Sequence, residues 1–226
     1  MKTILIGPTG FLGENFLRLN PKITAVGRNK PYNNVKDFVK IDEHFNFSPL
    51  DNLLFDRAIF LVGSSDHQVI NNHRSLAYDM NVLPLAKFLF YCSKRKTKPK
   101  KIVTFTTMLQ YDSKKMNIPC NEKQPINPYE SNYVLSKVMA EQLSMLYRKF
   151  FDIIDIRLSN VYGPTHLIRP DLVPTLLYKA IVKKEKISVW SKKPIRDFVY
   201  VDDVIYAVMN LLNSEFSGPI NIGSGI

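Results

Sequence analysis

The sequence of 226 residues contains only two cysteines, Cys92 and Cys120, and their spacing matches no metal-binding or redox motif. We therefore expect two reduced thiols and no metal site. No stretch approaches the roughly 20 consecutive apolar residues of a membrane-spanning helix. The apolar start of the chain also reaches Gly7 too soon for a signal peptide. These absences predict a cytoplasmic protein that does not span a membrane.

Acidic residues are scarce as well. The chain has 20 Asp and Glu but 31 Lys and Arg, which gives a net charge of +11. Such a charge is compatible with binding nucleic acid, but the sequence carries no recognisable nucleic-acid motif. The densest basic run, residues 94–101, lies where a helix is expected to end, and cations stabilise helix C-termini. We therefore expect a solvated turn there, no nucleic-acid partner, and an attraction for an anionic substrate or cofactor.

Hydrophobic residues make up 45% of the chain, which is enough for the core of one large domain. Internal repeats and low-complexity segments are absent. Short apolar runs alternate with helical patterns, as in a parallel sheet that is covered on both faces. The expected strands are residues 2–6, 23–26, 38–42, 58–62 and 102–106, and the expected long helices cover residues 69–93 and begin near Tyr129.

A glycine-rich turn follows the first expected strand directly and leads into a short helix that Asn20-Pro21 ends. Strand, glycine turn and helix together let the backbone approach a pyrophosphate and place it on a helix N-terminus. The alternative is a plain tight turn. The pattern favours a dinucleotide site formed by Gly7, Thr9, Gly10, Phe11, Leu12 and Gly13.

The second strand is followed by Arg28 and Lys30, where an NAD site usually has an acidic residue for the ribose 2′-hydroxyl. An arginine there accommodates a 2′-phosphate, so we expect NADP, with NAD as the alternative. The alternative is that both cations are solvent-exposed side chains of a loop. Asp42, after the third strand, could reach an adenine, and Val62 and Gly63 are expected to lie along the cofactor.

Tyr133 and Lys137 are four residues apart in the second long helix and therefore share a face. An ammonium about 4 Å away, at an effective dielectric near 20, favours a phenolate by roughly 4 kcal/mol. That effect could bring a tyrosine pKa from about 10 toward about 7, where it exchanges protons at neutral pH. Alone, such a pair is more often a half-buried ring beside a solvated charge. Thr107, at the end of the strand 102–106, is expected to meet the pair in one crevice.

These motifs, taken in order, resemble the extended short-chain dehydrogenase/reductase family, the NAD-dependent epimerase/dehydratase group that acts on nucleotide sugars. The resemblance covers nearly the whole chain. The segments that carry it are residues 7–13, Asn81-Val82, Thr106-Thr107 before Tyr111, residues 133–137, 157–164, 196–203 and 221–225.

The resemblance implies that Thr107, Tyr133 and Lys137 are the catalytic residues. By the same resemblance, Asn81, Tyr133 and Lys137 belong to the cofactor site, with Lys137 on the nicotinamide ribose. It also implies that Asn160 and Arg196 contact the substrate diphosphate, although Arg196 beside Asp197 could equally form a structural ion pair. Trp190 is expected near the nucleobase or in the core. Sugar dehydratases of the family have Asp-Glu after the catalytic threonine, whereas Met108-Leu109 stand here, so the sequence favours an epimerase or a 4-ketosugar reductase over a dehydratase.

The expected fold is α/β, a Rossmann-like doubly wound parallel sheet with a small C-terminal substrate-binding lobe that is shortened relative to the family. One NAD(P)-binding domain would cover residues 1–226, with the lobe formed mainly by residues 160–200 and 214–226. By analogy the two long helices would form a homodimer through a four-helix bundle. The long polar loop 112–128 is a candidate lid. A cofactor-binding sensor without catalysis is the alternative function.

Overall fold

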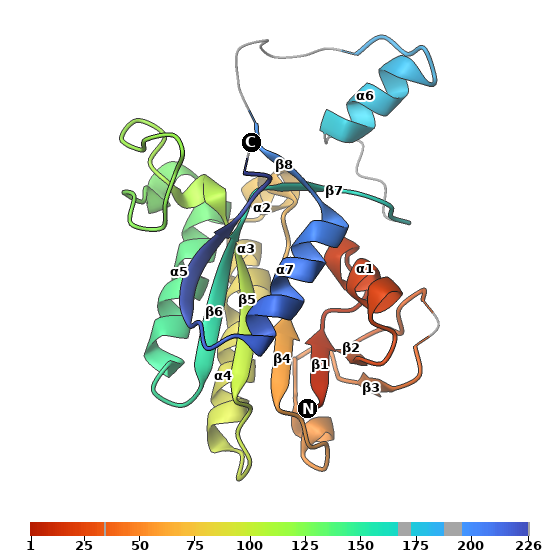
Figure 1. Cartoon of the computed structure of the whole chain (residues 1–226), viewed down its shortest axis with the longest axis vertical. Coiled ribbons are helices and arrows are strands. Elements are labelled where there is room, and N and C mark those ends of the chain that lie inside the picture. Colours follow the sequence, from red (N-terminus) through yellow and green to blue (C-terminus); the bar gives the residue numbers. More distant parts are fainter. Residues whose placement is uncertain (34, 167–172, 188–195, 226) are drawn as a thin grey trace.

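The computed structural model describes residues 1–33, 35–166, 173–187 and 196–225, and it contains a seven-stranded sheet whose strands all run parallel. The strand order is β3-β2-β1-β4-β5-β6-β9 (Figure 1). The order changes direction between β1 and β4, which defines a doubly wound, Rossmann-like sheet with a crevice at that point. The strands are β1 Thr3–Ile6, β2 Thr24–Gly27, β3 Phe38–Lys40, β4 Arg57–Phe60, β5 Lys101–Thr107, β6 Asp152–Leu158 and β9 Gly218–Ile222.

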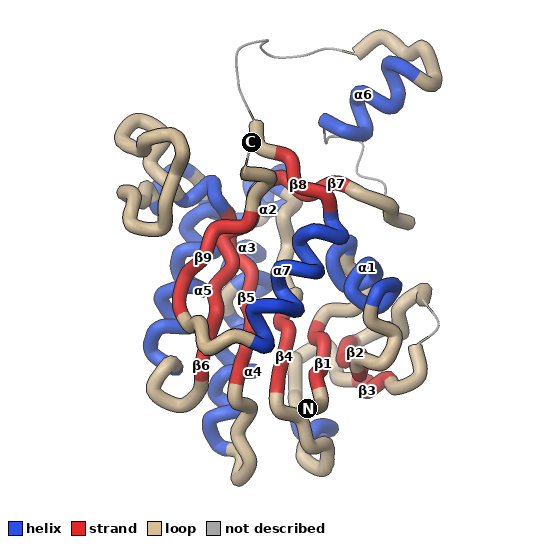
Figure 2. Tube along the Cα trace, in the orientation of Figure 1, coloured by secondary structure: helices blue, strands red, loops and turns tan. Residues whose placement is uncertain are grey.

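Helices cover both faces of the sheet (Figure 2). One face packs against α4 (Leu83–Lys94) and α5 (Asn132–Tyr147), and the other packs against α1 (Phe11–Leu19) and α7 (Val201–Asn213). Alternate residues of one strand enter different cores, as Ile4 and Ile6 do on the first face and Leu5 on the second. Burial on both sides explains the continuous apolar strands in the sequence.

The long helix expected over residues 69–93 is wrong, because the chain forms α2 (His67–Asn72), α3 (Arg74–Asn81) and α4 in its place. Pro84 lies in the first turn of α4 and cannot continue a preceding helix, since it lacks an N–H and its ring clashes with the preceding turn. The third strand likewise ends at Lys40 rather than at residue 42.

The helix that carries Tyr133 begins later than expected. A 3₁₀ turn, η3 (Pro128–Glu130), precedes it, and Ser131 caps α5 by accepting a hydrogen bond from the Val134 N–H through its hydroxyl, at 3.1 Å. Two further 3₁₀ turns are η1 (Ser48–Leu50) and η2 (Met108–Gln110). The cap fixes the first turn of α5, where Tyr133 lies.

A second, two-stranded sheet of β7 (Asn160–Tyr162) and β8 (Phe198–Tyr200) lies beyond the carboxyl ends of the main strands, and α6 (Val173–Ile181) stands apart from it (Figure 1). Residues 218–222, expected in the substrate lobe, pair with β6 as β9 of the main sheet. None of the helices formed by the described residues has both the length and the apolar character that crossing a membrane requires.

Candidate active site

An open cleft of about 480 Å³ lies at the carboxyl ends of β1, β2 and β4, where the strand order changes direction. A larger hollow of about 720 Å³ lies at the amino end of β1, near Lys2 and Pro21. Ligands of doubly wound sheets bind at the carboxyl ends, so the smaller cleft is the candidate site. Its walls include the glycine turn, Arg28, Phe45, Val62, Gly63, Leu76 and Met80.

The three glycines of the turn meet three different requirements. Gly7 has a φ of +89°, which favours glycine, and Gly13 packs so closely on the turn that a Cβ would lie 2.5 Å from the Gly7 carbonyl oxygen. Gly10 has no heavy atom within 4 Å of such a Cβ, and it caps the N-terminus of α1. The exposed backbone at Gly10 and the helix end fit a pyrophosphate, as the sequence predicts.

Arg28 lines the cleft, with its guanidinium 5.5 Å from the centre of the Phe45 ring. A guanidinium held on an aromatic face is preoriented for an anion. In sequence, Asp42 falls between Ile41 and Phe45, which both line the cleft. Its carboxylate accepts a hydrogen bond from the Asn46 N–H at 2.8 Å. The role of Asp42 toward an adenine stays a prediction.

The ammonium of Lys137 lies at the wall of the cleft rather than in bulk water. A Cβ on Gly63 would come within 3.2 Å of Lys137 Nζ, and Nζ donates a hydrogen bond to the Phe105 carbonyl at 3.2 Å. Although Lys137 keeps some exposed surface as a residue, its ammonium is enclosed, and this desolvation lowers the pKa of Lys137 to about 8. The Tyr133 ring, one turn earlier and only 6% exposed, has its centre 5.9 Å from Nζ.

Thr107 is the last residue of β5, and its side chain is buried. Its hydroxyl accepts a hydrogen bond from the Leu109 N–H at 3.2 Å and so caps η2. Helix α5 packs against both β5 and η2. The fold thus brings Thr107, Tyr133 and Lys137 to adjoining elements at one end of the sheet.

Asn81 connects the loop after β4 to α5. Its Oδ1 accepts from the Ser64 N–H at 2.8 Å, and its Nδ2 donates to Ser136 Oγ at 3.0 Å. Ser136 in turn donates to the Tyr133 carbonyl at 2.7 Å. Both amide atoms of Asn81 are therefore engaged with protein groups, and Asn81 connects the loop after β4 to the first turn of α5; its role toward a cofactor stays a prediction.

The chain matches the model of the NAD dependent epimerase/dehydratase family over residues 3–223. The chain belongs to this family. Its doubly wound sheet, glycine turn and helix-borne Tyr133 and Lys137 are the features through which the sequence resembles it.

Relatives within the family act on several nucleotide sugars. A putative UDP-glucose 4-epimerase of Methanocaldococcus jannaschii is 29% identical over 189 residues, which cover 82% of this chain and 59% of that protein. A GDP-L-fucose synthase of Sinorhizobium fredii is 36% identical over 113 residues, covering 45% of this chain and 36% of that one. The chain therefore spans at most about three-fifths of these two relatives.

Solved structures with the same fold include MoeE5 in complex with UDP-glucose and NAD. It has a TM-score of 0.83 at 22% identity, covering all of this chain and 77% of that one. A UDP-N-acetylglucosamine 4-epimerase from Methanobrevibacter ruminantium M1 has a TM-score of 0.84 at 20% identity, covering 98% of this chain and 76% of that one. At such identities these likenesses establish the fold alone.

Asn160, the first residue of β7, pairs with Phe198 of β8, and the exposed Arg196 lies two residues before Phe198. Asn160 Nδ2 donates to the Asp197 carbonyl at 3.0 Å, and the Asp197 carboxylate accepts from the Ser224 N–H at 3.1 Å. Burial alone would raise the pKa of Asp197, but hydrogen bonds from Ser224 bring it below its ordinary value. Trp190 lies outside the described residues.

Two buried charged residues next to the site were missed as functional candidates in the sequence. Glu141 and Arg157 are 4% and 3% exposed and pair with each other. Glu141 lies one helical turn beyond Lys137, and Arg157 opens one of the segments that resemble the family. The sequence did offer a signal, because Glu141 is four residues after Lys137 and must share a helix face with it.

Proposed function

We propose that this chain is an NAD(P)-dependent epimerase or 4-ketosugar reductase that acts on a nucleotide-activated sugar. The observation that carries the proposal is the enclosed ammonium of Lys137, which lies beside Gly63 in the cleft wall and one turn from buried Tyr133. Relatives named as a UDP-glucose 4-epimerase, a GDP-L-fucose synthase and a dTDP-4-dehydro-6-deoxy-D-allose reductase support the substrate class.

In this proposal Tyr133 exchanges a proton with a hydroxyl or ketone oxygen of the sugar, and Thr107 donates a hydrogen bond to the same oxygen. Protonated Lys137 stabilises the phenolate form of Tyr133, because its charge is little screened in an enclosed site. When bound, a nicotinamide supplies the hydride chemistry. Dehydration is disfavoured, since Met108 and Leu109 after Thr107 cannot move a proton.

The cleft fits a dinucleotide, because Gly10 leaves the backbone accessible at the N-terminus of α1. We expect NADP, since Arg28 lines the cleft where the adenosine ribose of a dinucleotide would lie. NAD is the alternative, and solved relatives were captured with it. On the substrate side, Asn160 and Arg196 are proposed to hold the diphosphate, with the lobe formed mainly from residues 160–200.

Replacing Tyr133 with Phe removes only the hydroxyl, so we expect turnover of nucleotide sugars to fall by about a thousandfold while NADPH affinity is unchanged. The matched control is Tyr129→Phe, because Tyr129 is 85% exposed just before the same helix. Turnover is measured by nicotinamide absorbance with 4-ketosugars and by chromatographic separation of the epimers with UDP-sugars, because epimerisation causes no net change in the cofactor. A fully active Tyr133→Phe enzyme would remove Tyr133 from the mechanism, and a wild-type protein that binds NADPH but transforms no sugar would indicate a sensor.

A further inference from the structure

Glu141 extends the catalytic face of α5 by one turn beyond Lys137. Its carboxylate is buried and accepts hydrogen bonds from Arg157 of β6 through both oxygens. Oε1 lies 2.5 Å from Nη2, and Oε2 lies 3.1 Å from Nε. A two-point contact of this kind fixes the orientation of both side chains. It therefore sets the distance and rotation of α5 relative to β6.

The same carboxylate also holds the strand that ends in Thr107. Glu141 Oε2 accepts a hydrogen bond from Gln110 Nε2 at 2.9 Å and lies 3.4 Å from Thr106 Oγ1, whose single proton is shared with the Ile156 carbonyl at 3.2 Å. These two donors flank Thr107 in sequence, one before it and one after it. Glu141 thus connects the helix that carries Tyr133 and Lys137 to both sides of Thr107.

Arg157 carries the connection further, into the long loop 112–127. Its Nη1 donates to the Tyr111 hydroxyl and to the Glu122 carbonyl, each at 2.9 Å. The Tyr111 hydroxyl donates to Asn221 Oδ1 of β9 at 2.6 Å. The burial of an ion pair is weak evidence for stability, because its desolvation can cost as much as its attraction returns.

We infer that Glu141 and Arg157 are positioning residues that set Thr107 against Tyr133 and Lys137 and anchor the base of the loop 112–127. The inference rests on the proposed function for its catalytic consequence. A misplacement of about 1 Å at reacting groups can cost about a hundredfold in rate, so loosening this pair lowers kcat. Substrate and cofactor affinity depend on the cleft and on the β7–β8 side and are unaffected.

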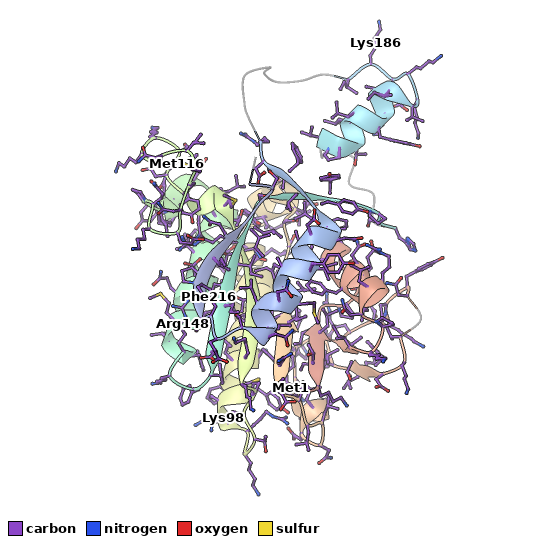
Figure 3. The ribbon with its side chains drawn as sticks, viewed as in Figure 1. Met1, Lys98, Met116, Arg148, Lys186 and Phe216 are labelled. Carbon is purple, nitrogen blue, oxygen red and sulfur yellow. The ribbon has the colours of Figure 1, made fainter. Side chains whose placement is uncertain are left out.

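The chain offers a control in a second ion pair, which links the C-terminal end of α5 to β6 and β5. Arg148, the residue that follows α5, has Nη2 2.6 Å from Asp155 Oδ2 of β6, and Thr104 Oγ1 of β5 donates to Asp155 Oδ1 at 2.6 Å. Figure 3 shows Arg148 at the end of α5 that lies away from the loop carrying Met116. Each pair joins an arginine to a carboxylate, but the two differ in their distance from Thr107 and in burial, since the Arg148 side chain is 26% exposed and the Arg157 side chain is 4% exposed.

The test replaces each pair with apolar residues of similar volume, which is often neutral or stabilising for a buried ion pair. One double variant is Glu141→Leu with Arg157→Met, and the control is Asp155→Leu with Arg148→Met. Thermal unfolding establishes that each folds. Should the first fail to fold, Glu141→Gln takes its place, because it keeps the volume while removing the charge. Steady-state kcat and KM are measured, together with hydrogen exchange of residues 105–111.

We expect the Glu141/Arg157 variant to lose about a hundredfold in kcat with KM unchanged, and to exchange residues 105–111 faster than wild type. The control variant keeps both properties. Equal kcat or equal exchange in the two double variants would overturn the inference. If wild type itself transforms no nucleotide sugar, the proposed function fails, while the exchange comparison still decides whether the pair positions Thr107.

Discussion

At the scale of single residues, the enclosure of Lys137 matters most. The helical spacing of Tyr133 and Lys137 was visible in the sequence, but the contact of Nζ with Gly63 joins segments 74 positions apart and could not be predicted from spacing. A solvated lysine stabilises a phenolate weakly. Desolvation by the surrounding fold strengthens that effect and lowers the pKa of Lys137 to about 8.

This pKa makes stability depend on pH. Lys137 falls from an ordinary pKa of 10.5 in the unfolded chain to about 8 when folded. Between these values the unfolded chain binds more protons, so stability rises with pH across that window. Below it, burying the charge costs up to about 3 kcal/mol. We expect Lys137→Met to be inactive yet more stable than wild type at pH 7, with the advantage shrinking above pH 8.

Urea unfolding at neutral pH and at pH 10 measures this difference. The control is Lys98→Met, because Lys98 is an exposed lysine in the turn before β5 and its removal leaves the pH dependence unchanged. A Lys137→Met protein that is less stable than wild type by the same amount at both pH values would contradict the account of the enclosed ammonium.

We propose that Arg28 sets the preference for NADPH over NADH. We expect wild type to bind NADPH more tightly than NADH, and Arg28→Ala to weaken NADPH binding by about tenfold or more, since a charge-assisted hydrogen bond is lost. The control is Lys30→Ala. Lys30 is exposed on the same loop and is not one of the described residues that line the cleft. Fluorescence titration measures both affinities. Equal affinity for NADH and NADPH in wild type would refute the preference.

At the scale of elements, β1 to β5 were predicted because most of them are short apolar runs buried on two faces, whereas β6 to β9 were not predicted. The division of residues 67–94 into three helices was missed, although Pro84 was available as the signal. Helix α5 was predicted with its first residue misplaced, because residues 128–130 form a separate 3₁₀ turn and the Ser131 hydroxyl then caps α5 by accepting a hydrogen bond from the Val134 N–H.

Two neighbouring helices expose apolar residues at heptad spacing, Leu83 with Phe90 on α4 and Met139 with Leu146 on α5. Since α4 and α5 pack side by side, we expect two copies to join through these helices as a four-helix bundle. Phe90→Glu with Leu146→Glu should convert a dimer to a monomer in light scattering.

The control for this surface is Tyr206→Glu, which changes a residue 60% exposed on α7, on the opposite face of the sheet. It should leave the dimer intact. A wild-type protein that remains a monomer at high concentration would exclude the bundle.

At the scale of the whole molecule, the sheet brings together residues from three distant parts of the chain at the ends of β1, β4 and β5. The family and the fold class were recognisable from the sequence because the motifs occur in a fixed order. The Glu141–Arg157 pair was not recognised as part of the site, since its two-point contact depends on how α5 lies against β6. The sequence of α6 is apolar, so it did not predict that this helix has no buried residues and stands apart from the main sheet.

The central claim is that hydride moves between a nucleotide sugar and a nicotinamide held beside Tyr133 and Lys137. The most direct measurement incubates the protein with NADPH or NADH deuterated at the hydride-donating carbon and with nucleotide 4-ketosugars, and analyses the sugars by mass spectrometry. A reductase and an epimerase both reduce such a ketone, whereas an epimerase acting on a labelled sugar would return the label to it. The account predicts that deuterium appears on the sugar ring with wild type and not with Tyr133→Phe. A protein that binds both ligands yet transfers no deuterium to any of the ketosugars would contradict it.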